Sequence, residues 1–491
     1  MFIGIDLGTS SLKVIVLDRT HQVRASASAP LTLQQPQRLW REQNPSDWWA
    51  ACQQALQAAL AQAAAAGIAA QSIESIGLTG QMHGATLLDA QGAVLRPAIL
   101  WNDGRAFDAC KELERRVPAS RQITGNLMMP GFTAPKLLWV AEHEPDFFSR
   151  IDKVLLPKDY LRWRLTGEFA SDMSDAAGSL WLDVGRRDWS DELLAATGLS
   201  RTHMPRLYEG PEMTGHLKPA LAQQFGLRAI PVVAGASDNA AGALGAGVVQ
   251  PGDAMLSLGT SGVFFVATDG FRANPAQAVH SFCHALPGTW HLMSVMLSAA
   301  ACLDFTARLT GEPDVTRLLA EAQAQGLSDD TPLFLPYLNG ERTPHNNPAA
   351  QAVFFGLGAA TCRADLVNAT LEGVGHGLAQ GIAALESTGV LAKTISLIGG
   401  GSRSPWWAQM LADLTGRTLL RRADGEVGPA LGAAQLAWMA TDKTSAVDVC
   451  PPPALVATHE PDKERNAWFS ERHARFTRLY QQVEPSFLPP V

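Results

Sequence analysis

The chain has 491 residues, 46% of them apolar, and a formal net charge of −8 at pH 7. Its length predicts at least two domains, and its negative charge gives no general attraction to nucleic acid or to anionic membranes. The six scattered cysteines contain no CxxC pair, which argues against disulfides and zinc, and no apolar run is long enough to cross a bilayer. We therefore expect a cytoplasmic protein whose partners are neither nucleic acid nor membrane.

The first apolar segment, FIGIDLGTSSLKVIVLD at residues 2–18, is interrupted by Asp6 and by a turn of Gly8, Thr9 and Ser10. β-Branched residues on both sides of a short Gly/Thr/Ser turn predict a β-hairpin. Three further elements are predicted before residue 101: a helix at 45–65 and strands at 73–81 and 93–100. Strands that alternate with helices indicate the α/β class.

The same pattern recurs in MLSLGTSGVFFVATD at residues 255–269. This repeat predicts two domains related by internal duplication, over residues 1–245 and 246–491, that face each other across a central cleft. The small residues at 242–253 predict a hinge at the boundary. The elements expected after the second hairpin are a helix at 296–309, a loop at 335–348, a helix at 365–386 and a strand at 393–404.

The two Gly-Thr-Ser turns raise the question of phosphate binding. Such turns expose backbone N–H groups and hydroxyls with little side-chain bulk, as an approaching phosphate requires. Either turn alone could be ordinary hairpin chemistry, but the repetition favours two phosphate-binding turns. No P-loop and no GxGxxG is present. A third glycine-rich turn, IGGGSRS at residues 398–404, precedes a helix whose N-terminus could donate further N–H groups to a nucleotide.

The hairpins, the GGGS turn and their order resemble the sugar kinase, Hsp70 and actin superfamily, and more narrowly the FGGY family of carbohydrate kinases. Two segments that resemble FGGY signatures are GFTAPKLLWVAEH at 131–143 and AVFFGLGAATCRADLVNATLE at 352–372. Four segments resemble the bacterial members that phosphorylate xylulose: residues 80–89, 99–105, 123–139 and 281–300. The resemblance implies two ribonuclease H-like (actin-like ATPase) domains, with ATP and Mg²⁺ as cofactors. It also implies phosphorylation of D-xylulose at its 5-hydroxyl in xylose catabolism, and a homodimer by family analogy.

The resemblance also implies which residues do the chemistry. Asp238, which follows an apolar strand, is the general base, although a helix N-cap is the other reading of an acid at this place. Asp6 reaches Mg²⁺ through water, and the alternative is a buried structural carboxylate. The implied ketose contacts are Gln81, Met82, His83, Asp238 and Asn239. The implied ATP contacts are Gly8, Thr9, Ser10, Gly259, Thr260, Ser261, Gly400, Gly401, Ser402 and Ser404.

Other conspicuous residues receive structural interpretations or none. The HSFCH segment at 280–284 is read as structural, because no cluster of further metal ligands accompanies it. Asp172 and Asp175 receive no role, and Glu341 and Arg342 are expected to form an ion pair that holds their loop. Two rivals stay open: a family member acting on ribulose, gluconate, glycerol or a deoxyhexulose, and a non-catalytic ATP clamp of the Hsp70 or actin type.

Overall fold

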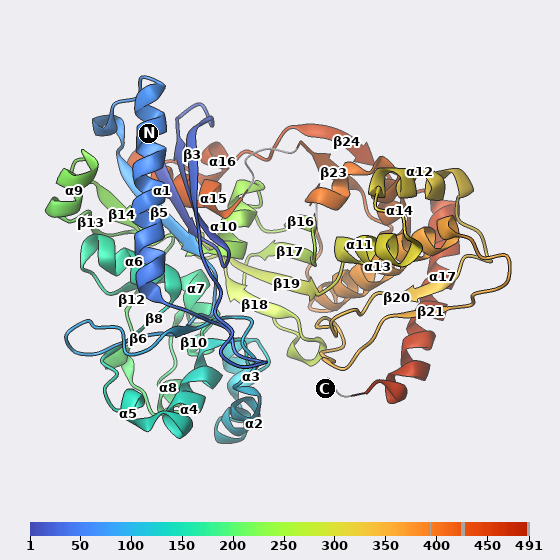
Figure 1. The fold of residues 1–491 in the computed structure, drawn as a ribbon, viewed down its shortest axis with the longest axis horizontal. Coiled ribbons are helices and arrows are strands. Elements are labelled where there is room, and N and C mark those ends of the chain that lie inside the picture. The colour runs from blue at the N-terminus through green and yellow to red at the C-terminus, as the bar shows by residue number, and fades with distance from the viewer. Residues whose placement is uncertain (393, 424–427, 489–491) are drawn as a thin grey trace.

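The computed structural model describes residues 1–392, 394–423 and 428–488. Two α/β halves, each built around a mixed sheet, stand side by side (Figure 1). The first sheet contains β1 (Phe2–Leu7), β2 (Ser11–Leu17), β3 (Val23–Pro30), β5 (Ser75–Gly80), β13 (Met213–His216), β14 (Pro231–Val233) and β15 (Ala236–Ser237). The second contains β16 (Asp253–Leu258), β17 (Gly262–Thr268), β18 (His280–Cys283), β19 (Trp290–Met296), β22 (Thr394–Ile398), β23 (Leu419–Arg422) and β24 (Leu455–His459).

The two sheets share the same central arrangement. β1 pairs antiparallel with β2 and parallel with β5, and β16 pairs antiparallel with β17 and parallel with β22. Each Gly-Thr-Ser turn joins the antiparallel pair of its sheet, so both predicted hairpins are confirmed. Because strand order and direction repeat as well as the sequence, the predicted internal duplication is confirmed at the level of the fold.

Helices cover both sheets. The main helices of the first half are α1 (Pro45–Ala65), α4 (Thr133–His143), α6 (Pro157–Thr166), α7 (Met173–Ala177) and α10 (Asp238–Gly245). Those that follow are α11 (Ala300–Thr310), α12 (Val315–Gln325), α13 (Arg363–Glu386), α14 (Pro405–Thr415), α15 (Pro429–Asp442) and α17 (Lys463–Val483). No helix in the described part of the chain is long and apolar enough to span a membrane.

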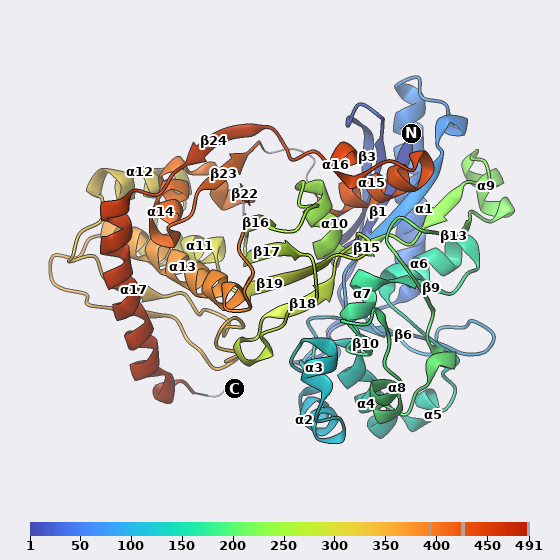
Figure 2. The same ribbon diagram turned by 180° about the vertical axis from the view of Figure 1, so that it is seen from behind.

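One late helix belongs spatially to the first half. α15 packs against β1 and β5, and Figures 1 and 2 place this orange-red helix among the blue elements. A Cβ atom at Gly4 would lie 1.9 Å from the Ala430 carbonyl oxygen, and one at Gly77 would lie 1.9 Å from that of Ala433. The two glycines therefore allow the helix backbone to rest directly on the sheet.

The predicted hinge at 242–253 is wrong for its first four residues. Residues 242–245 form the last turn of α10, which packs closely on α15, and a Cβ at Gly432 would lie 1.9 Å from the Ala241 carbonyl oxygen. Small residues at this position therefore serve close helix packing rather than flexibility. The segment from Ala246 to Gly252 connects the two sheets.

Several predicted elements shift. The predicted strand at 93–100 reduces to β7 (Ala98–Ile99), because Pro97 has no backbone N–H to donate to a sheet. The predicted helix at 296–309 begins only at Ala300, since Met296 still belongs to β19. The predicted strand at 393–404 ends at Ile398 and is followed by a 3₁₀ turn at Gly400–Arg403, and its first residue lies outside the described residues.

Candidate active site

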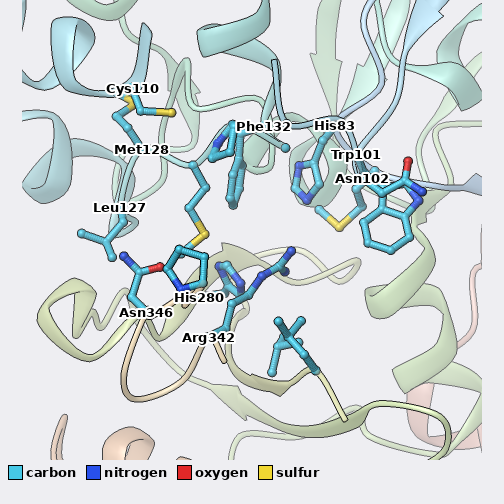
Figure 3. Close-up of a pocket in the computed structure, with 18 of the residues that line it drawn as sticks. His83, Trp101, Asn102, Cys110, Leu127, Met128, Phe132, His280, Arg342 and Asn346 are labelled. Carbon is cyan, nitrogen blue, oxygen red and sulfur yellow. The ribbon is translucent and has the colours of Figure 1, made fainter. Parts of the chain in front are cut away.

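A pocket of about 780 Å³ lies between the two halves. The first half contributes Met82, His83, Trp101, Asp238 and Asn239 to its lining. The second half contributes Ser261, Val263, His280, Glu341 and Arg342, among others. Figure 3 shows side chains from both halves converging on one space. The pocket therefore brings together most of the predicted ketose contacts and one residue of the second phosphate turn.

Asp238 is the first residue of α10 and does not cap it. The N-cap is Ser237, whose Oγ accepts from the Ala240 amide at 3.4 Å, so the N-cap reading of Asp238 is wrong. The backbone and side-chain N–H groups of Asn239 donate to Asp238 Oδ1 at 2.7 and 2.9 Å. Oδ2 has no hydrogen-bond partner within the described ranges and is free to accept a substrate hydroxyl. Burial, and after it the charge of Asp6, raises the pKa of Asp238 to about 7, near the value that suits a general base.

His83 presents a hydrogen-bond acceptor to the pocket. Its Nδ1 lies 2.6 Å from the Gly178 carbonyl oxygen, which can only accept, so Nδ1 carries the hydrogen. Burial lowers the pKa of His83 to about 3, and the ring is therefore neutral with a lone pair on Nε2. Lys136 Nζ and Thr133 Oγ1 donate to the His83 carbonyl oxygen at 2.9 and 3.2 Å and hold this residue at its φ of 67°.

Met82 supplies an apolar wall beside His83. Its side chain is buried, and its sulfur accepts weakly from Asn239 Nδ2 at 3.8 Å. A Cβ at Gly178 would lie 2.7 Å from both Met82 Cε and His83 Cε1, so this glycine leaves room for the pair. Met82 thus lies next to His83 and contacts Asn239, the residue that follows Asp238.

Gln81 does not reach the pocket, and its predicted contact with the ketose is not supported by its position. Its amide accepts from Thr9 Oγ1 at 3.1 Å and donates to Gln43 Oε1 at 3.0 Å. Gln43 in turn donates to the Thr9 carbonyl oxygen at 2.7 Å and accepts from the Trp48 indole at 2.9 Å. Trp101, which lines the pocket, donates its indole N–H to Thr9 Oγ1 at 3.0 Å. The first phosphate turn is therefore bonded to a wall of the pocket.

Asp6 lies on β1, opposite Lys13 in the hairpin register. Burial raises the pKa of Asp6 to about 6, with Lys13 acting in the opposite direction, and the charge of Asp6 also acts on Asp238. Two carboxylates with raised pKa values in one partly buried place form a donor set that suits a hard divalent cation with retained waters. No group of three or more His, Cys, Asp or Glu side chains suited to a metal occurs among the described residues. Mg²⁺ therefore fits here only with waters and phosphate oxygens completing its shell.

The second Gly-Thr-Ser turn, at 259–261, and the glycine-rich third turn, at 398–404, differ in which of their atoms are accessible to a ligand. In the second, the Gly259 and Thr260 carbonyl oxygens accept from Ala300 and Ala299 at 2.9 Å each, at the start of α11. In the third, a Cβ at Gly400 would meet no atom within 4 Å, whereas one at Gly401 would lie 2.6 Å from Leu258. Gly400 thus borders open space, and Gly401 is required for packing.

The two serines of the third turn are already bonded within the protein. Ser402 Oγ donates to the Gly399 carbonyl oxygen at 2.7 Å. Ser404 caps α14, and its Oγ accepts from the Trp407 amide at 3.3 Å. Backbone groups, rather than these two hydroxyls, are therefore the free polar atoms that this turn offers to a ligand.

The segment that contains Asp172 and Asp175 supports the residue before Asp238. Asp172 caps α7 and accepts from Ser174 Oγ at 2.5 Å, and Ser174 Oγ accepts from the Ser237 amide at 2.9 Å. Lys158 Nζ lies 2.7 Å from Asp172 and 3.3 Å from Asp175 in a fully buried cluster. Through Ser174 the cluster holds Ser237, the N-cap of α10, a role that the sequence did not reveal.

The expected ion pair between Glu341 and Arg342 is wrong. Glu341 Oε1 instead accepts from the amides of Leu297 and Arg342 at 2.9 and 2.7 Å, and burial raises the pKa of its carboxyl to about 7. Both residues line the pocket, and the Arg342 side chain extends into it (Figure 3). Sequence reasoning named neither Arg342 nor Trp101 as a pocket residue, although Trp101 lies in the segment 99–105 that resembles the xylulose-phosphorylating members of the family.

Comparison with known proteins agrees with this geometry. Residues 1–245 match the N-terminal domain of the FGGY family of carbohydrate kinases, and residues 254–441 match its C-terminal domain. The chain is 57% identical over 486 residues to the xylulose kinase of Escherichia coli K12, covering 99% of both chains. It is 37% identical over 452 residues to the xylulose kinase of Bacillus subtilis, covering 91% of this chain and 90% of the relative.

Solved structures give the same result. A crystal structure described as a xyloylose kinase from Brucella ovis has a TM-score of 0.94 at 45% identity, over 99% of both chains. Xylulose kinase from Rhodospirillum rubrum has a TM-score of 0.92 at 29% identity, again over 99% of both chains. With two matched domains that span most of its length, the chain belongs to the FGGY family of carbohydrate kinases.

Proposed function

We propose that the protein transfers the γ-phosphate of ATP to the 5-hydroxyl of D-xylulose, yielding D-xylulose 5-phosphate and ADP. The observation that carries this proposal is the pairing of Asp238, with its free Oδ2, and neutral His83 in one pocket between the two halves. The relatives that are 57% and 37% identical over nearly the whole chain are named xylulose kinases, which favours xylulose over the other sugars of the family.

The proposed roles follow from the hydrogen-bond acceptors that these side chains leave without a partner. Asp238 Oδ2 accepts the hydrogen of the 5-hydroxyl while the oxygen attacks the γ-phosphorus and the bond to ADP breaks. His83 Nε2 accepts a hydrogen bond from another hydroxyl, Met82 forms an apolar wall, and the Asn239 side-chain oxygen adds an acceptor. A wrong epimer would leave such buried groups unpaired, at about 1–3 kcal/mol each.

ATP is proposed to lie along the two hairpin turns and the glycine-rich third turn. The phosphates would meet the backbone N–H groups of Thr9 and Ser10 on one side and those of Thr260 and Ser261 on the other. Gly8 and Gly259, whose own N–H groups donate within their turns to Ser11 and Ser261, would leave room for the phosphates to approach. Backbone groups of Gly400 and Gly401 would face the nucleoside. Asp6 would hold Mg²⁺ through water, and the ion would neutralise phosphate charge during transfer.

The division of labour between the halves is part of the proposal. Residues 1–245 would bind the sugar and one side of the phosphates, and residues 246–491 would bind the rest of ATP, with α15 returning to complete the first half. Because ATP is the phosphate donor, we place the reaction in the cytoplasm. A homodimer stays a prediction from family analogy, to be measured by light scattering.

Coupled ADP release with D-xylulose, D-ribulose and L-xylulose tests the function. We expect turnover with D-xylulose to exceed that with either of the others by at least about tenfold, since one misplaced hydroxyl costs on the order of 1–3 kcal/mol. ATP hydrolysis without sugar should be slow, because water must be excluded until both substrates are bound. Preference for D-ribulose, or ATP turnover that is independent of sugar, would overturn the proposal.

A further inference from the structure

Arg342 is a cation of the pocket whose charge is balanced only in part by the neighbouring Glu341 carboxyl, since burial raises the pKa of that carboxyl to about 7. Within the described ranges its guanidinium makes no hydrogen bond and no ion pair, although the residue is partly buried. The surrounding loop is firmly held, since Glu341 and Asn347 exchange backbone hydrogen bonds of 2.9 and 2.8 Å and Thr343 Oγ1 donates to the Ala278 carbonyl oxygen at 3.0 Å. A guanidinium that is partly withdrawn from water and has no hydrogen-bond partner is unfavourable, so a rigid loop that presents one to a pocket suggests a ligand.

The direction of the Arg342 side chain indicates which end of the pocket its ligand would occupy. In Figure 3 the side chain extends from beside His280 toward the side of the pocket that holds His83. Its charge contributes to the lowered pKa values of both histidines, after burial, which agrees with this proximity. Asp238, by contrast, feels the charge of Asp6 after burial. Arg342 therefore faces the His83 end of the pocket, away from the carboxylates that face the transferring phosphate.

At the His83 end of the pocket, His83 offers an acceptor and Arg342 offers donors. His83 Nε2 is an acceptor, because Nδ1 carries the hydrogen toward Gly178. The Asn239 side-chain N–H group donates to Asp238, and the Trp101 indole N–H donates to Thr9. Arg342 is a donor only, and its donors are free. A hydroxyl satisfies His83 Nε2, whereas an oxygen without hydrogen, the carbonyl of a ketose, matches the guanidinium.

We propose that Arg342 is a specificity-determining substrate residue that donates to the C2 carbonyl oxygen of a ketose whose 5-hydroxyl lies at Asp238. This inference rests on the proposed function and adds a contact from the second half of the molecule to those of His83 and Asp238 from the first. The ketose then bridges the two halves, with the reacting hydroxyl at one end and the carbonyl at the other.

The test compares two ligands that differ only at C2. The first is D-xylulose, and the second is 2-deoxy-D-threo-pentitol, the alcohol obtained by reducing 2-deoxy-D-xylose, which keeps the other hydroxyls and has no oxygen at C2. Calorimetry measures the binding of each to the full-length protein without nucleotide. Arg342→Gln should weaken D-xylulose binding by about 10- to 100-fold, the range for a hydrogen bond to a charged group, and change binding of the pentitol by less than about threefold.

Two further variants keep the result interpretable. Arg342→Lys retains the positive charge but loses the planar guanidinium with its paired donors. It should bind D-xylulose more tightly than Arg342→Gln and more weakly than the wild type. Lys111→Gln removes an exposed cation at the rim of the same pocket and should leave both affinities within about twofold, which controls for general electrostatic attraction. Unchanged thermal stability of Arg342→Gln, or of Arg342→Lys if the first variant folds poorly, separates binding from folding.

Kinetics complete the test. We expect KM for D-xylulose to rise in parallel with the dissociation constant while kcat falls by less than about threefold. Equal weakening of both ligands, unchanged D-xylulose affinity, or a large fall in kcat at constant affinity would each overturn the proposal, the last by moving Arg342 to the transferring phosphate. Failure of the wild-type protein to phosphorylate D-xylulose would instead overturn the proposed function.

Discussion

The two hairpins descend from one pattern but are held in different ways. In the first, Thr9 is bonded through both its hydroxyl and its carbonyl oxygen, to Gln81, Trp101 and Gln43. In the second, Thr260 is bonded through its carbonyl oxygen to the start of α11, and its hydroxyl has no partner in the described part of the chain. The first turn is thus bonded to a wall of the pocket, and the second to the start of α11.

The hairpins also differ in charge. Asp6 and Lys13 face each other across the first hairpin, whereas in the second Ser257, at the position that corresponds to Asp6, faces Val263. The charged chemistry is therefore concentrated on the first hairpin and on Asp238 beside it. The two hairpins thus share a fold and a Gly-Thr-Ser turn, and the first also carries a pair of opposite charges beside its turn.

The largest effect should come from the base that neighbours the first hairpin. Asp238→Asn keeps the shape of the side chain and removes the proton acceptor, so turnover should fall by about 10²- to 10⁴-fold. D-Xylulose binding, measured by calorimetry, should change much less. Near-normal turnover in this variant would remove the general-base role and with it the asymmetry between the two halves.

A second experiment makes the hairpins alike. Asp6→Ser gives the first hairpin the residue that the second has, and should lower turnover by about 10²- to 10³-fold, as expected for loss of one group that stabilises transition-state charge. Ser257→Ala, at the corresponding position of the second hairpin, is the matched control and should stay within about threefold. Comparable losses in both variants would contradict the proposed division between the hairpins.

A third experiment weakens the bond between the pocket wall and the first turn. Trp101→Phe retains an aromatic ring but loses the N–H donated to Thr9, so kcat/KM for D-xylulose should fall by about 2- to 10-fold, the range for one hydrogen bond. The KM for ATP should change less, because the second hairpin does not depend on this contact. If ATP binding suffers more than the sugar, the first turn is not coupled to the pocket in the way we describe.

The smallest effect concerns stability. Burial and the charge of Asp6 raise the pKa of Asp238 from 3.8 to about 7, so the folded protein holds this proton more tightly than the unfolded chain does. The resulting stabilisation is complete below pH 4 and is lost as pH rises toward 7. Asp238→Asn should therefore gain melting temperature over the wild type between pH 5 and pH 7, levelling off at pH 8. A constant difference across this range would mean that folding does not raise the pKa of Asp238.

Much of the fold could be predicted because it depends on local patterns. The hairpins and the helices near 45–65 and 365–386 follow from turn chemistry and from runs of helix-forming residues. Asp238 and His83 came from the family resemblance, and their geometry supports the proposed roles. The strand at 93–100 failed because a proline interrupts an otherwise suitable apolar run.

What could not be predicted was set by contacts between distant residues. Gln81 adjoins Met82 in sequence, yet its side chain accepts from Thr9, a residue 72 positions earlier in the chain. Arg342 lines the pocket without an ion-pair partner in the described ranges while Glu341 accepts from backbone amides, an arrangement that no local pattern indicates. Ser174 supports the residue before Asp238 from a segment more than sixty positions earlier in the chain.

The packing of α15 on the first sheet has a consequence for folding during synthesis. The face of β1 and β5 around Gly4 and Gly77 is covered by residues 429–442, so the earliest strands made by the ribosome wait for almost the last helix before their surface is complete. A nascent chain of the first 250 residues should expose this apolar groove and depend on chaperones, and the same fragment expressed alone should aggregate unless a peptide of residues 428–445 is supplied.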